Sequence, residues 1–319
     1  MKNSYSNIFP YNEKILNKTV KLLNKGNIVS LPTETVYGLA GNAYSKKAIE
    51  KIFKQKGRPK FNPLIIHYHN IHRTLDDIVI NNNFKRLYKK LCPGPITFIL
   101  RKKKNSKIHP LANAKLKTVA VRFPKHKVIR SILNNIDYPL AMPSANLSSN
   151  VSPVCARDVF DEFNKKIRLI VDGGRSKIGI ESTVIDLTNK PKILRPGIIG
   201  LAKIKKILNL VVKKHSSNLK IKSPGMLKKH YSPGIPVLIN QTKFNSKNAI
   251  IYLGKKFKKK KNYFSLSEDC NLNEAASNLY ATFRLIKKKG FKKIQIARIP
   301  FSGLGIAIND RIKRAAKKK

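Results

Sequence analysis

Short apolar runs alternate with segments of helical periodicity along the first 200 residues, and glycine and proline separate them. From Glu13 to Lys25 the apolar residues recur at helical spacing and the pattern ends at Gly26, which predicts an amphipathic helix. Ser45 is a suitable N-cap for a second helix that ends near Lys56 and Pro59. Strands are predicted at residues 28–31, 64–67, 96–100, 119–123, 140–142, 169–171, 183–187 and 192–194. Together these elements predict one sheet-based domain.

The pattern changes from about Lys205 onward. A helix is expected to end within residues 213–218, and two Ser-Pro-Gly triplets at 223–225 and 232–234 bracket an irregular segment with the composition of a linker. Strands near 237–239, 249–252 and 294–297 and helices near 272–287 and 306–316 predict a second, smaller α/β domain. We therefore predict an α/β protein with a first domain at 1–210, a linker at 211–235 and a second domain at 236–319.

Composition adds a strong positive charge to this picture. The 319 residues include 67 Lys and Arg against 16 Asp and Glu, a formal net charge of +51, while 41% of residues are apolar. That apolar content excludes global disorder, and the charge attracts phosphates, nucleotides and nucleic acids. The lysines are densest at 101–104, 255–261 and 317–319. A solvated, lysine-rich surface is the favoured interpretation, and a dedicated nucleic-acid stripe is the alternative.

The cysteines and the N-terminal residues favour a cytoplasmic protein. Cys92, Cys155 and Cys270 are far apart in the sequence and form no CxxC pair, so reduced, buried thiols are expected. The first residues lack an apolar signal core, and no stretch approaches the roughly 20 apolar residues that span a bilayer. These features predict neither secretion nor membrane insertion.

Polar residues concentrate where predicted strands end, which is the edge at which open α/β sheets bind ligands. Lys56 and Arg58 lie in a Gly-Pro turn, and Arg122 follows a strand, so three cations could converge on anionic oxygens. Neutral contacts would come from hydroxyl groups, namely those of Thr35, Thr118, Ser144, Ser152 and Ser182. This combination suits a phosphate or a carboxylate.

Each segment also has a purely structural interpretation. The Lys56 to Arg58 segment could be a solvated turn, Thr33 to Thr35 a helix cap and Ser144 to Asn146 an ordinary turn. His67 could be a half-buried structural histidine, and the segment from Arg195 to Gly197 a turn before a helix. The sequence contains no GxSxG elbow, no P-loop and no GxGxxG after the first strand. The spacing of the acidic residues Glu34, Asp172, Glu181 and Asp186 argues against a metal cage made of protein carboxylates.

Six segments in order resemble the threonylcarbamoyl-AMP synthase family in its long, two-domain form, whose catalytic half is a YrdC-type domain. They are residues 30–39, 51–67, 93–97, 119–124, 143–146 and 179–186. The segments 223–226 and 230–233 look like the interdomain linker of this family, and 303–311 resembles the end of its accessory domain.

The resemblance implies both a fold and an activity. The fold is an open, twisted, mixed sheet of YrdC type with a concave basic face, followed by a smaller Rossmann-like α/β domain. The activity is that of a nucleotidyltransferase that forms L-threonylcarbamoyl-adenylate from L-threonine, bicarbonate or CO2, and ATP, with release of pyrophosphate. The product serves the N6-threonylcarbamoyladenosine modification of tRNA through a downstream threonylcarbamoyl-transferase, and tRNA itself is a further candidate partner. Mg2+ would be carried by ATP phosphates and water.

Family roles are carried over by motif. The residues implied for L-threonine are Thr35, His67, Arg122, Met142 and Ser182. Those implied for ATP are Arg58, Asn62, Thr118, Ser144, Ser152, Arg195 and the linker residue Tyr231. Lys56, Arg58, Ser144 and Asn146 are implied as catalytic. The alternative is an RNA-binding module of the same fold without adenylate synthesis, because a concave basic sheet also suits RNA. Relatives that mature metalloenzymes usually carry zinc-finger cysteines, which are absent here.

Overall fold

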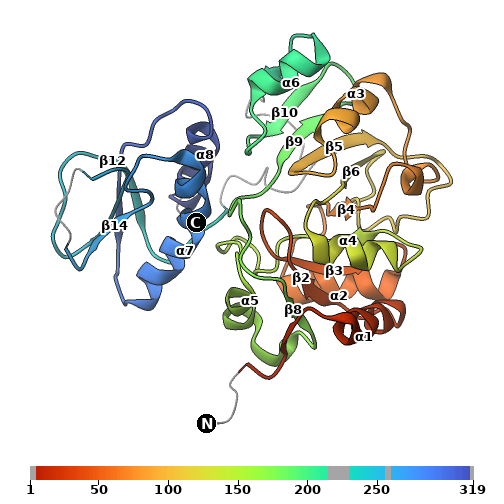
Figure 1. Ribbon diagram of the computed structural model, residues 1–319, viewed down its shortest axis with the longest axis horizontal. Helices are drawn as coiled ribbons and strands as arrows, with labels where there is room; N and C mark the ends of the chain where they lie inside the picture. Colours follow the sequence, from red (N-terminus) through yellow and green to blue (C-terminus); the bar gives the residue numbers. More distant parts are fainter. Residues whose placement is uncertain (1–4, 215–229, 256–259, 317–319) are drawn as a thin grey trace.

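Two sheets organise the protein, as the computed structural model of residues 5–214, 230–255 and 260–316 shows (Figure 1). The larger sheet is mixed, with eleven strands in the order β1-β8-β2-β3-β7-β4-β6-β5-β9-β10-β11. The smaller sheet has four parallel strands in the order β12-β15-β13-β14. This architecture confirms the expected mixed α/β sheet followed by a smaller α/β unit.

The strands of the larger sheet are β1 (Ile8–Pro10), β2 (Val29–Leu31), β3 (Gly38–Asn42), β4 (Ile65–His67), β5 (Ile96–Arg101), β6 (Thr118–Arg122), β7 (Leu140–Ala141), β8 (Ile170–Asp172), β9 (Thr183–Asp186), β10 (Lys192–Arg195) and β11 (Lys213–Lys214). The helices of this part are α1 (Glu13–Asn24), α2 (Lys46–Lys56), α3 (Asn82–Leu91), α4 (Lys127–Asn134), α5 (Ala156–Phe163) and α6 (Leu201–Leu208), with short 3-10 turns at His72–Thr74 and Asn164–Lys166. The C-terminal part contains β12 (Val237–Gln241), β13 (Ala249–Tyr252), β14 (Tyr263–Ser265), α7 (Leu272–Lys288), β15 (Ile294–Ala297) and α8 (Gly305–Ala315).

Local signals place the first two helices where the sequence predicts them. The Asn12 side chain accepts a hydrogen bond from the backbone of Ile15 and caps α1, and Ser45 caps α2 in the same way. Gly57 ends α2 in the left-handed region, with φ of 56°. The turn after α2 therefore starts at a defined residue, and this fixes where Arg58 leaves the helix.

The alternation of side chains along the central strands sorts the two faces of the sheet. Ile66 of β4 and Val119 and Val121 of β6 pack into the largest apolar cluster, against helices α2 and α3. Ile65 and Ala120 point to the other face, where the apolar cluster is small. His67 and Arg122 share the parity of Ile65 and Ala120, so both side chains belong to this second face.

Several elements differ from the sequence prediction. The helix expected to end within 213–218 ends at Leu208, because Asn209 adopts a left-handed backbone with φ of 50°, and Lys213–Lys214 pairs with β10 as a short strand. The pattern also missed strands β1, β3 and β14 and helices α3, α4 and α5. Strand β3 is nearly all buried and contains two glycines, so it has no alternation that a periodicity argument could detect.

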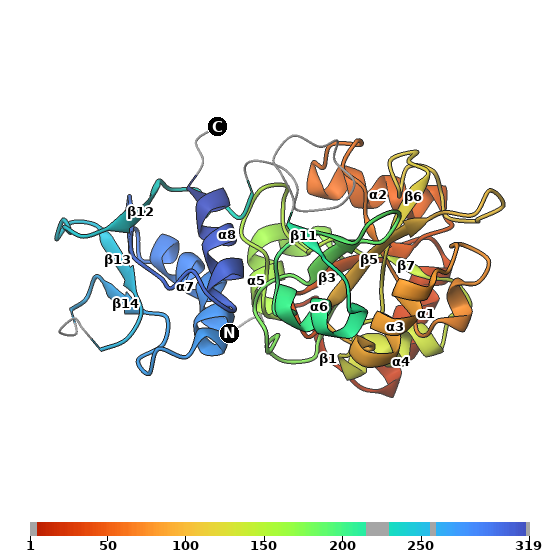
Figure 2. The same ribbon diagram turned by 90° about the horizontal axis from the view of Figure 1, so that it is seen from above.

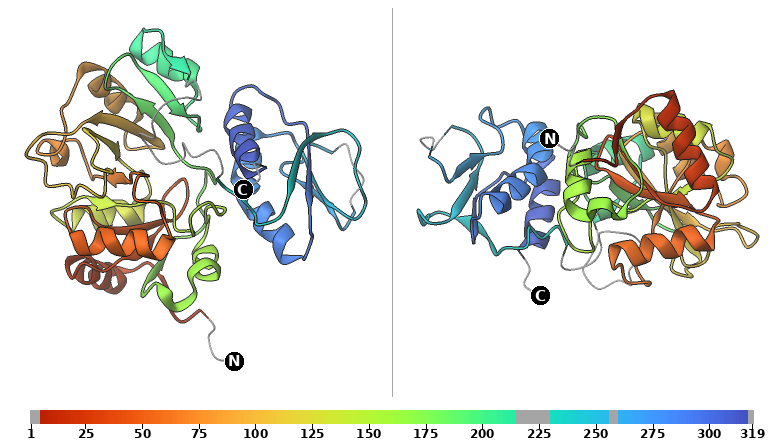
Figure 3. Two further views of the ribbon diagram at one scale, coloured as in Figure 1. Left: turned by 180° about the vertical axis from the view of Figure 1, so that it is seen from behind. Right: turned by 90° about the horizontal axis from the view of Figure 1, so that it is seen from below.

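The C-terminal part packs against the larger part through its helices. Figures 2 and 3 show α7 and α8 between the four-stranded sheet and the larger part. Val36, Val151 and Ile180 of the larger part belong to the same apolar cluster as Leu279 and Phe283 of α7. One apolar cluster therefore joins the larger part to the C-terminal part.

Some predictions fall outside the described residues or are corrected by them. The linker motif at 223–226, the terminal lysines at 317–319 and residues 256–259 of the lysine-rich loop lie outside the described ranges, and the domain boundaries stay predictions. The expectation of buried thiols is wrong for Cys270, which is exposed, while Cys92 and Cys155 are half-buried. Within the described ranges, no helix is long and apolar enough to cross a membrane.

Candidate active site

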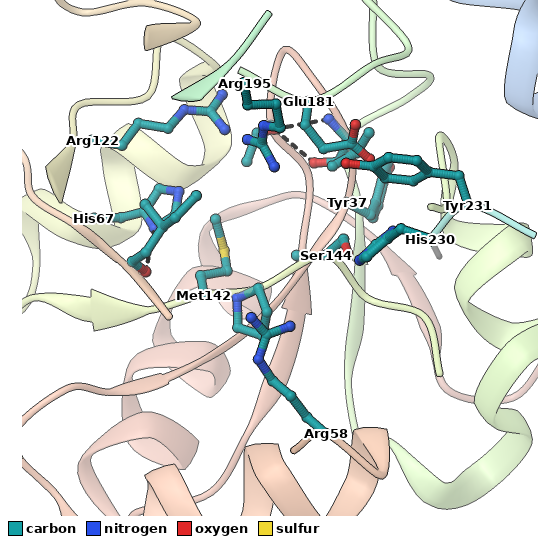
Figure 4. Close-up of a pocket in the computed structure, with 15 residues that line it drawn as sticks. Tyr37, Arg58, His67, Arg122, Met142, Ser144, Glu181, Arg195, His230 and Tyr231 are labelled. Atoms are coloured by element: carbon teal, nitrogen blue, oxygen red, sulfur yellow. Dashed lines mark hydrogen bonds between the residues drawn. The ribbon is translucent and has the colours of Figure 1, made fainter. Parts of the chain in front are cut away.

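A small cavity on the second face of the large sheet collects half of the predicted site residues (Figure 4). Those that line it are Arg58, His67, Arg122, Met142, Ser144, Arg195 and Tyr231. The side chains come from strand ends, from the turn after α2 and from the segment after β7, and they point into a common space. The cavity volume is about 40 Å3, much less than the roughly 300 Å3 or more of an ordinary small-molecule site. In this conformation the cavity is too small for such a ligand.

The turn after α2 supplies one buried cation to the cavity and one to its framework. Arg58 is only 8% exposed, and its guanidinium donates to the carbonyl oxygens of Asn62 at 3.0 Å and Pro63 at 2.8 Å. Lys56 is also buried, and its ammonium donates to the carbonyl oxygens of Ser144 and Asn146. The solvated-turn interpretation is therefore wrong. Lys56 fixes the loop that carries Ser144, whereas Arg58 reaches the cavity.

Arg122 is held by a carboxylate to which sequence reasoning gave no partner. Its Nη2 lies 2.7 Å from Oε1 of Glu34, and the other oxygen of Glu34 accepts the backbone N–H of Lys125 at 3.1 Å. Burial raises the pKa of Glu34, but the charge and hydrogen bond of Arg122 outweigh burial and the net pKa is lowered. Nε of Arg122 is buried without a hydrogen-bond partner in the described part of the chain. The Nε–H of Arg122 is therefore one donor that the described residues leave unsatisfied.

The segment around Glu34 does not cap a helix. Thr33 donates its hydroxyl to the carbonyl of Val36, accepts the backbone N–H of Thr35 and lies 2.9 Å from the Thr35 hydroxyl. Thr33 lines the cavity, and Thr35, which is not a lining residue, contacts it through Thr33. The only signal for Glu34 was its position as one of few acidic residues inside a tight, lysine-free segment.

His67 at the end of β4 is fully buried at 1% exposure rather than half-buried. Its Nδ1 lies 3.2 Å from the carbonyl oxygen of Ile65. Burial, and then the positive charge of Arg122, hold the pKa of His67 well below its usual range. The ring is therefore neutral at pH 7 and can exchange hydrogen bonds with a ligand without adding charge.

The segment after residue 180 and the end of β10 form another wall of the cavity, lined by Glu181 and Arg195. Arg195 donates from Nε to the carbonyl of Ser182 at 3.0 Å and from Nη2 to its hydroxyl at 3.1 Å. The Ser182 hydroxyl also lies 2.7 Å from that of Thr97. Ser182 therefore stands behind Arg195 and orients it.

Glu181 is a second carboxylate at the cavity to which sequence reasoning gave no role. It accepts the hydroxyl of Ser152 at 2.6 Å and of Tyr280 at 3.0 Å, and Nε of Arg311 at 2.8 Å. Burial raises the pKa of Glu181, but the charges of Arg311 and Arg195 together with these hydrogen bonds lower it to about 2. Ser152 does not line the cavity, and it contacts the site through Glu181.

Met142 sits on the floor of the cavity because Gly38 of β3 leaves room for it. A Cβ on residue 38 would lie 2.4 Å from Cγ of Met142. No side chain fits there, so the backbone of β3 and the thioether of Met142 pack directly.

His230 and Tyr231, which fall in the predicted linker, also line the cavity. Tyr231 is fully buried and has a left-handed backbone with φ of 66°. The ring centroids of His230 and Tyr231 lie 4.1 Å apart. The Tyr231 hydroxyl and Nδ1 of His230 have no hydrogen-bond partner among the described residues. Burial lowers the pKa of His230 to about 3, which keeps the ring neutral. Two polar atoms of these residues are therefore left for a ligand to satisfy.

Three of the predicted residues stand apart from the cavity. The amide of Asn146 donates to the carbonyl oxygens of Leu147 and Asn150, and Asn62 contacts Arg58 through its backbone. Thr118 lies at the far end of β6 from Arg122 and lines a second, open hollow of about 750 Å3 that also includes residues 101–104. The ligand roles of these residues stay predictions.

The electrostatics favour an anionic ligand. Burial, followed by the positive charge of nearby Arg195, lowers the pKa of Arg58. The charged form of Arg58 is therefore destabilised by its surroundings when no anion is bound. An anion placed between the two arginines would relieve this repulsion. Within residues 5–214, 230–255 and 260–316, no group of three His, Cys, Asp or Glu side chains is placed to hold a metal ion. The fold and the site together define an α/β protein with a buried, arginine-lined cavity whose charge suits an anion.

Comparison with known proteins identifies the family. A Sua5/YciO/YrdC family model, described as "Telomere recombination", matches residues 21–197, and "Threonylcarbamoyl-AMP synthase, C-terminal domain" matches residues 199–317. The chain is 35% identical to the threonylcarbamoyl-AMP synthase of Pyrococcus abyssi over 92% of each chain. It is 34% identical to the Bacillus subtilis enzyme of the same name, covering 96% of this chain and 94% of the relative. The crystal structure of P. abyssi Sua5 complexed with L-threonine superposes with a TM-score of 0.89 at 32% identity, covering 97% of both chains.

The chain belongs to the two-domain threonylcarbamoyl-AMP synthase family. Its activity is that of this ATP-using synthase. The match extends over both the larger sheet and the C-terminal part, so the expectation drawn from the six sequence segments is confirmed.

Proposed function

We propose that the arginine-lined cavity is where L-threonine, bicarbonate and ATP combine, with L-threonine beside Arg122 and His67 and the phosphates between Arg58 and Arg195. The observation that carries the proposal is the convergence of three buried guanidiniums on one cavity that also holds a neutral imidazole. The related P. abyssi structure contains L-threonine, which supports an amino-acid subsite here. Arg122 binds the amino-acid carboxylate through its unpartnered Nε edge.

The chemistry needs a site that brings two anions together. The nitrogen of L-threonine takes up the carbon of bicarbonate, with loss of water, and becomes an N-carboxylate. An oxygen of this carboxylate then attacks the α-phosphorus of ATP, the bond from phosphorus to the bridging oxygen breaks, and pyrophosphate leaves. Arg58 and Arg195 offset the repulsion between carboxylate and triphosphate, and holding the reactants in line supplies the rest of the rate enhancement. No covalent enzyme intermediate is required.

Lys56 and Asn146 support this step by fixing the loop of Ser144, whose hydroxyl faces the nucleotide. Mg2+ would be carried by ATP and would offset phosphate charge; the arginines and hydroxyls of the cavity suit the phosphates themselves and would leave the ion to phosphate oxygens and water. Tyr231 and His230 withdraw to admit ATP and then close over it, because the closed cavity is too small for the substrates. The product passes to a threonylcarbamoyl-transferase for tRNA modification in the cytoplasm.

The test is threonine-dependent release of pyrophosphate from ATP in the presence of bicarbonate. We expect turnover by the wild-type chain and its loss in Arg58→Ala. Arg86→Ala is the matched control, because Arg86 donates to the carbonyls of Ile207 and Leu208, outside the cavity. If no pyrophosphate is released, or if its release does not depend on L-threonine, the RNA-binding alternative would be favoured.

A further inference from the structure

A fully buried arginine of the C-terminal part reaches the wall of the cavity. Arg311 of α8 has no exposed surface, and its Nε donates to Oε2 of Glu181 at 2.8 Å. Its Nη1 donates to the carbonyl of Pro196 at 2.8 Å and to Asp310 at 2.9 Å. Pro196 follows Arg195 directly in the chain. One side chain therefore ties together the two segments that form this wall.

The same arginine also contacts the predicted linker. Its guanidinium lies 5.3 Å from the ring centroid of Tyr231, a cation–π distance. The ring of Tyr280 on α7 stacks on Tyr231 at 5.7 Å, while its hydroxyl donates to Glu181. The backbone N–H of His230 donates to the carbonyl of Arg314 on α8 at 3.4 Å. Helices α7 and α8 thus form the surface on which the linker residues rest.

We propose that Arg311 is a positioning residue of the synthase reaction, supplied by the C-terminal part to hold Glu181 and Tyr231 where they shape the ATP subsite. The inference rests on the proposed function, in which Tyr231 closes over ATP. Its physical basis is charge: Glu181 lines a cavity that takes a triphosphate, and a carboxylate without a counter-charge would repel the phosphates. Arg311 neutralises that carboxylate and at the same time orients the tyrosine.

The docking of the two parts is close enough to define this position. Gly179, two residues before Glu181, has φ of 74°, and a Cβ there would lie 2.5 Å from the backbone Cα of Ser277 on α7. The backbones therefore touch without an intervening side chain. Because this contact leaves little freedom between α7 and the segment of Glu181, the Arg311 side chain meets its partners in one geometry.

A purely structural brace between the two parts exists elsewhere and serves as the control. Arg284 of α7 donates to the carbonyl of Val151 at 2.6 Å and lies 3.5 Å from Glu162. It lines no part of the cavity. Arg284 therefore joins the same two parts without touching the ATP subsite.

The experiment compares Arg311→Lys with Arg284→Lys in the full chain. Lysine keeps the charge of Arg311 but cannot contact Glu181, Pro196 and Tyr231 together. We expect the KM for ATP to rise about tenfold or more in Arg311→Lys because the subsite is displaced, while L-threonine affinity by calorimetry stays within twofold of wild type. Arg284→Lys should change neither quantity. An unchanged KM for ATP in Arg311→Lys, or an equal loss of L-threonine affinity, overturns the inference.

A second variant keeps the test decisive if Arg311→Lys does not fold. Tyr280→Phe removes only the hydroxyl that donates to Glu181, and it should also raise the KM for ATP; wild-type kinetics would overturn the inference. Absence of turnover in the wild-type chain would refute the proposed function instead. In that case calorimetry with a non-hydrolysable ATP analogue tests the nucleotide subsite alone: weaker binding to Arg311→Lys than to wild type and Arg284→Lys supports a role of Arg311 in shaping this subsite, and equal binding overturns it.

Discussion

Arg122→Lys is the sharpest test of the amino-acid subsite. Replacement by alanine would leave Glu34 buried without its counter-charge, and breaking such a pair costs about 3–5 kcal/mol of folding free energy. The native Arg122–Glu34 pair is buried and its atoms are 2.7 Å apart, so Glu34 needs a positive charge beside it. Lysine at position 122 keeps that charge. A single ammonium cannot, however, also replace the unpartnered Nε edge.

The expected magnitude follows from one lost charge-assisted hydrogen bond. Such bonds contribute about 1.5–3 kcal/mol, which corresponds to a Kd for L-threonine that is roughly tenfold to a hundredfold higher. The KM for ATP should change much less, because Arg58 and Arg195 remain in place.

The measurement is isothermal titration with L-threonine, accompanied by thermal unfolding. Arg130→Lys is the control, because Arg130 donates to the carbonyl of His69 and does not line the cavity. Unchanged L-threonine affinity in a folded Arg122→Lys variant would refute the assignment of the carboxylate to Arg122.

Three further predictions concern the nucleotide side and the linker. Arg58→Ala should abolish most ATP turnover while L-threonine affinity by calorimetry stays near wild type; a parallel loss of both would contradict separate subsites. Tyr231→Ala should raise the KM for ATP in steady-state pyrophosphate assays, whereas an unaltered KM would exclude contact between this ring and the nucleotide. The pKa of His230 is lowered from 6.5 to about 3 on folding, so its stabilising contribution is present above pH 6.5 and is lost as the pH falls toward 3. In thermal unfolding experiments, the stability of His230→Gln should therefore fall less between pH 7 and pH 5 than that of the wild-type protein. An equal fall in both proteins would refute this linkage.

Much of the local structure could be predicted from the sequence. Strands such as Ile65–His67 and Ala249–Tyr252, and the caps of the first two helices, follow from short-range pattern and turn chemistry. The family resemblance pointed to the cavity residues Arg58, His67 and Arg122, because these side chains stand at strand ends or in turns with recognisable neighbours.

Side-chain partners could not be predicted in this way. Glu34 and Arg122 are 88 positions apart, and Glu181 and Arg311 are 130 apart. No local pattern reports such pairs, because they form only when distant strands and helices pack. The same holds for Lys56, which looks like a ligand-binding cation in the sequence but is bound to two carbonyl oxygens of the loop after β7.

The sequence by itself determined most of the central strands, the first two helices, the excess of positive charge and the segments that supply cations and hydroxyls, since these depend on periodicity and residue type. Only the tertiary structure decided which cations face the cavity, which are neutralised by a carboxylate and how the C-terminal helices approach the linker. The physical reason is that burial and long-range pairing set the charge and orientation of each group, and both arise only when the two sheets and their helices are packed together.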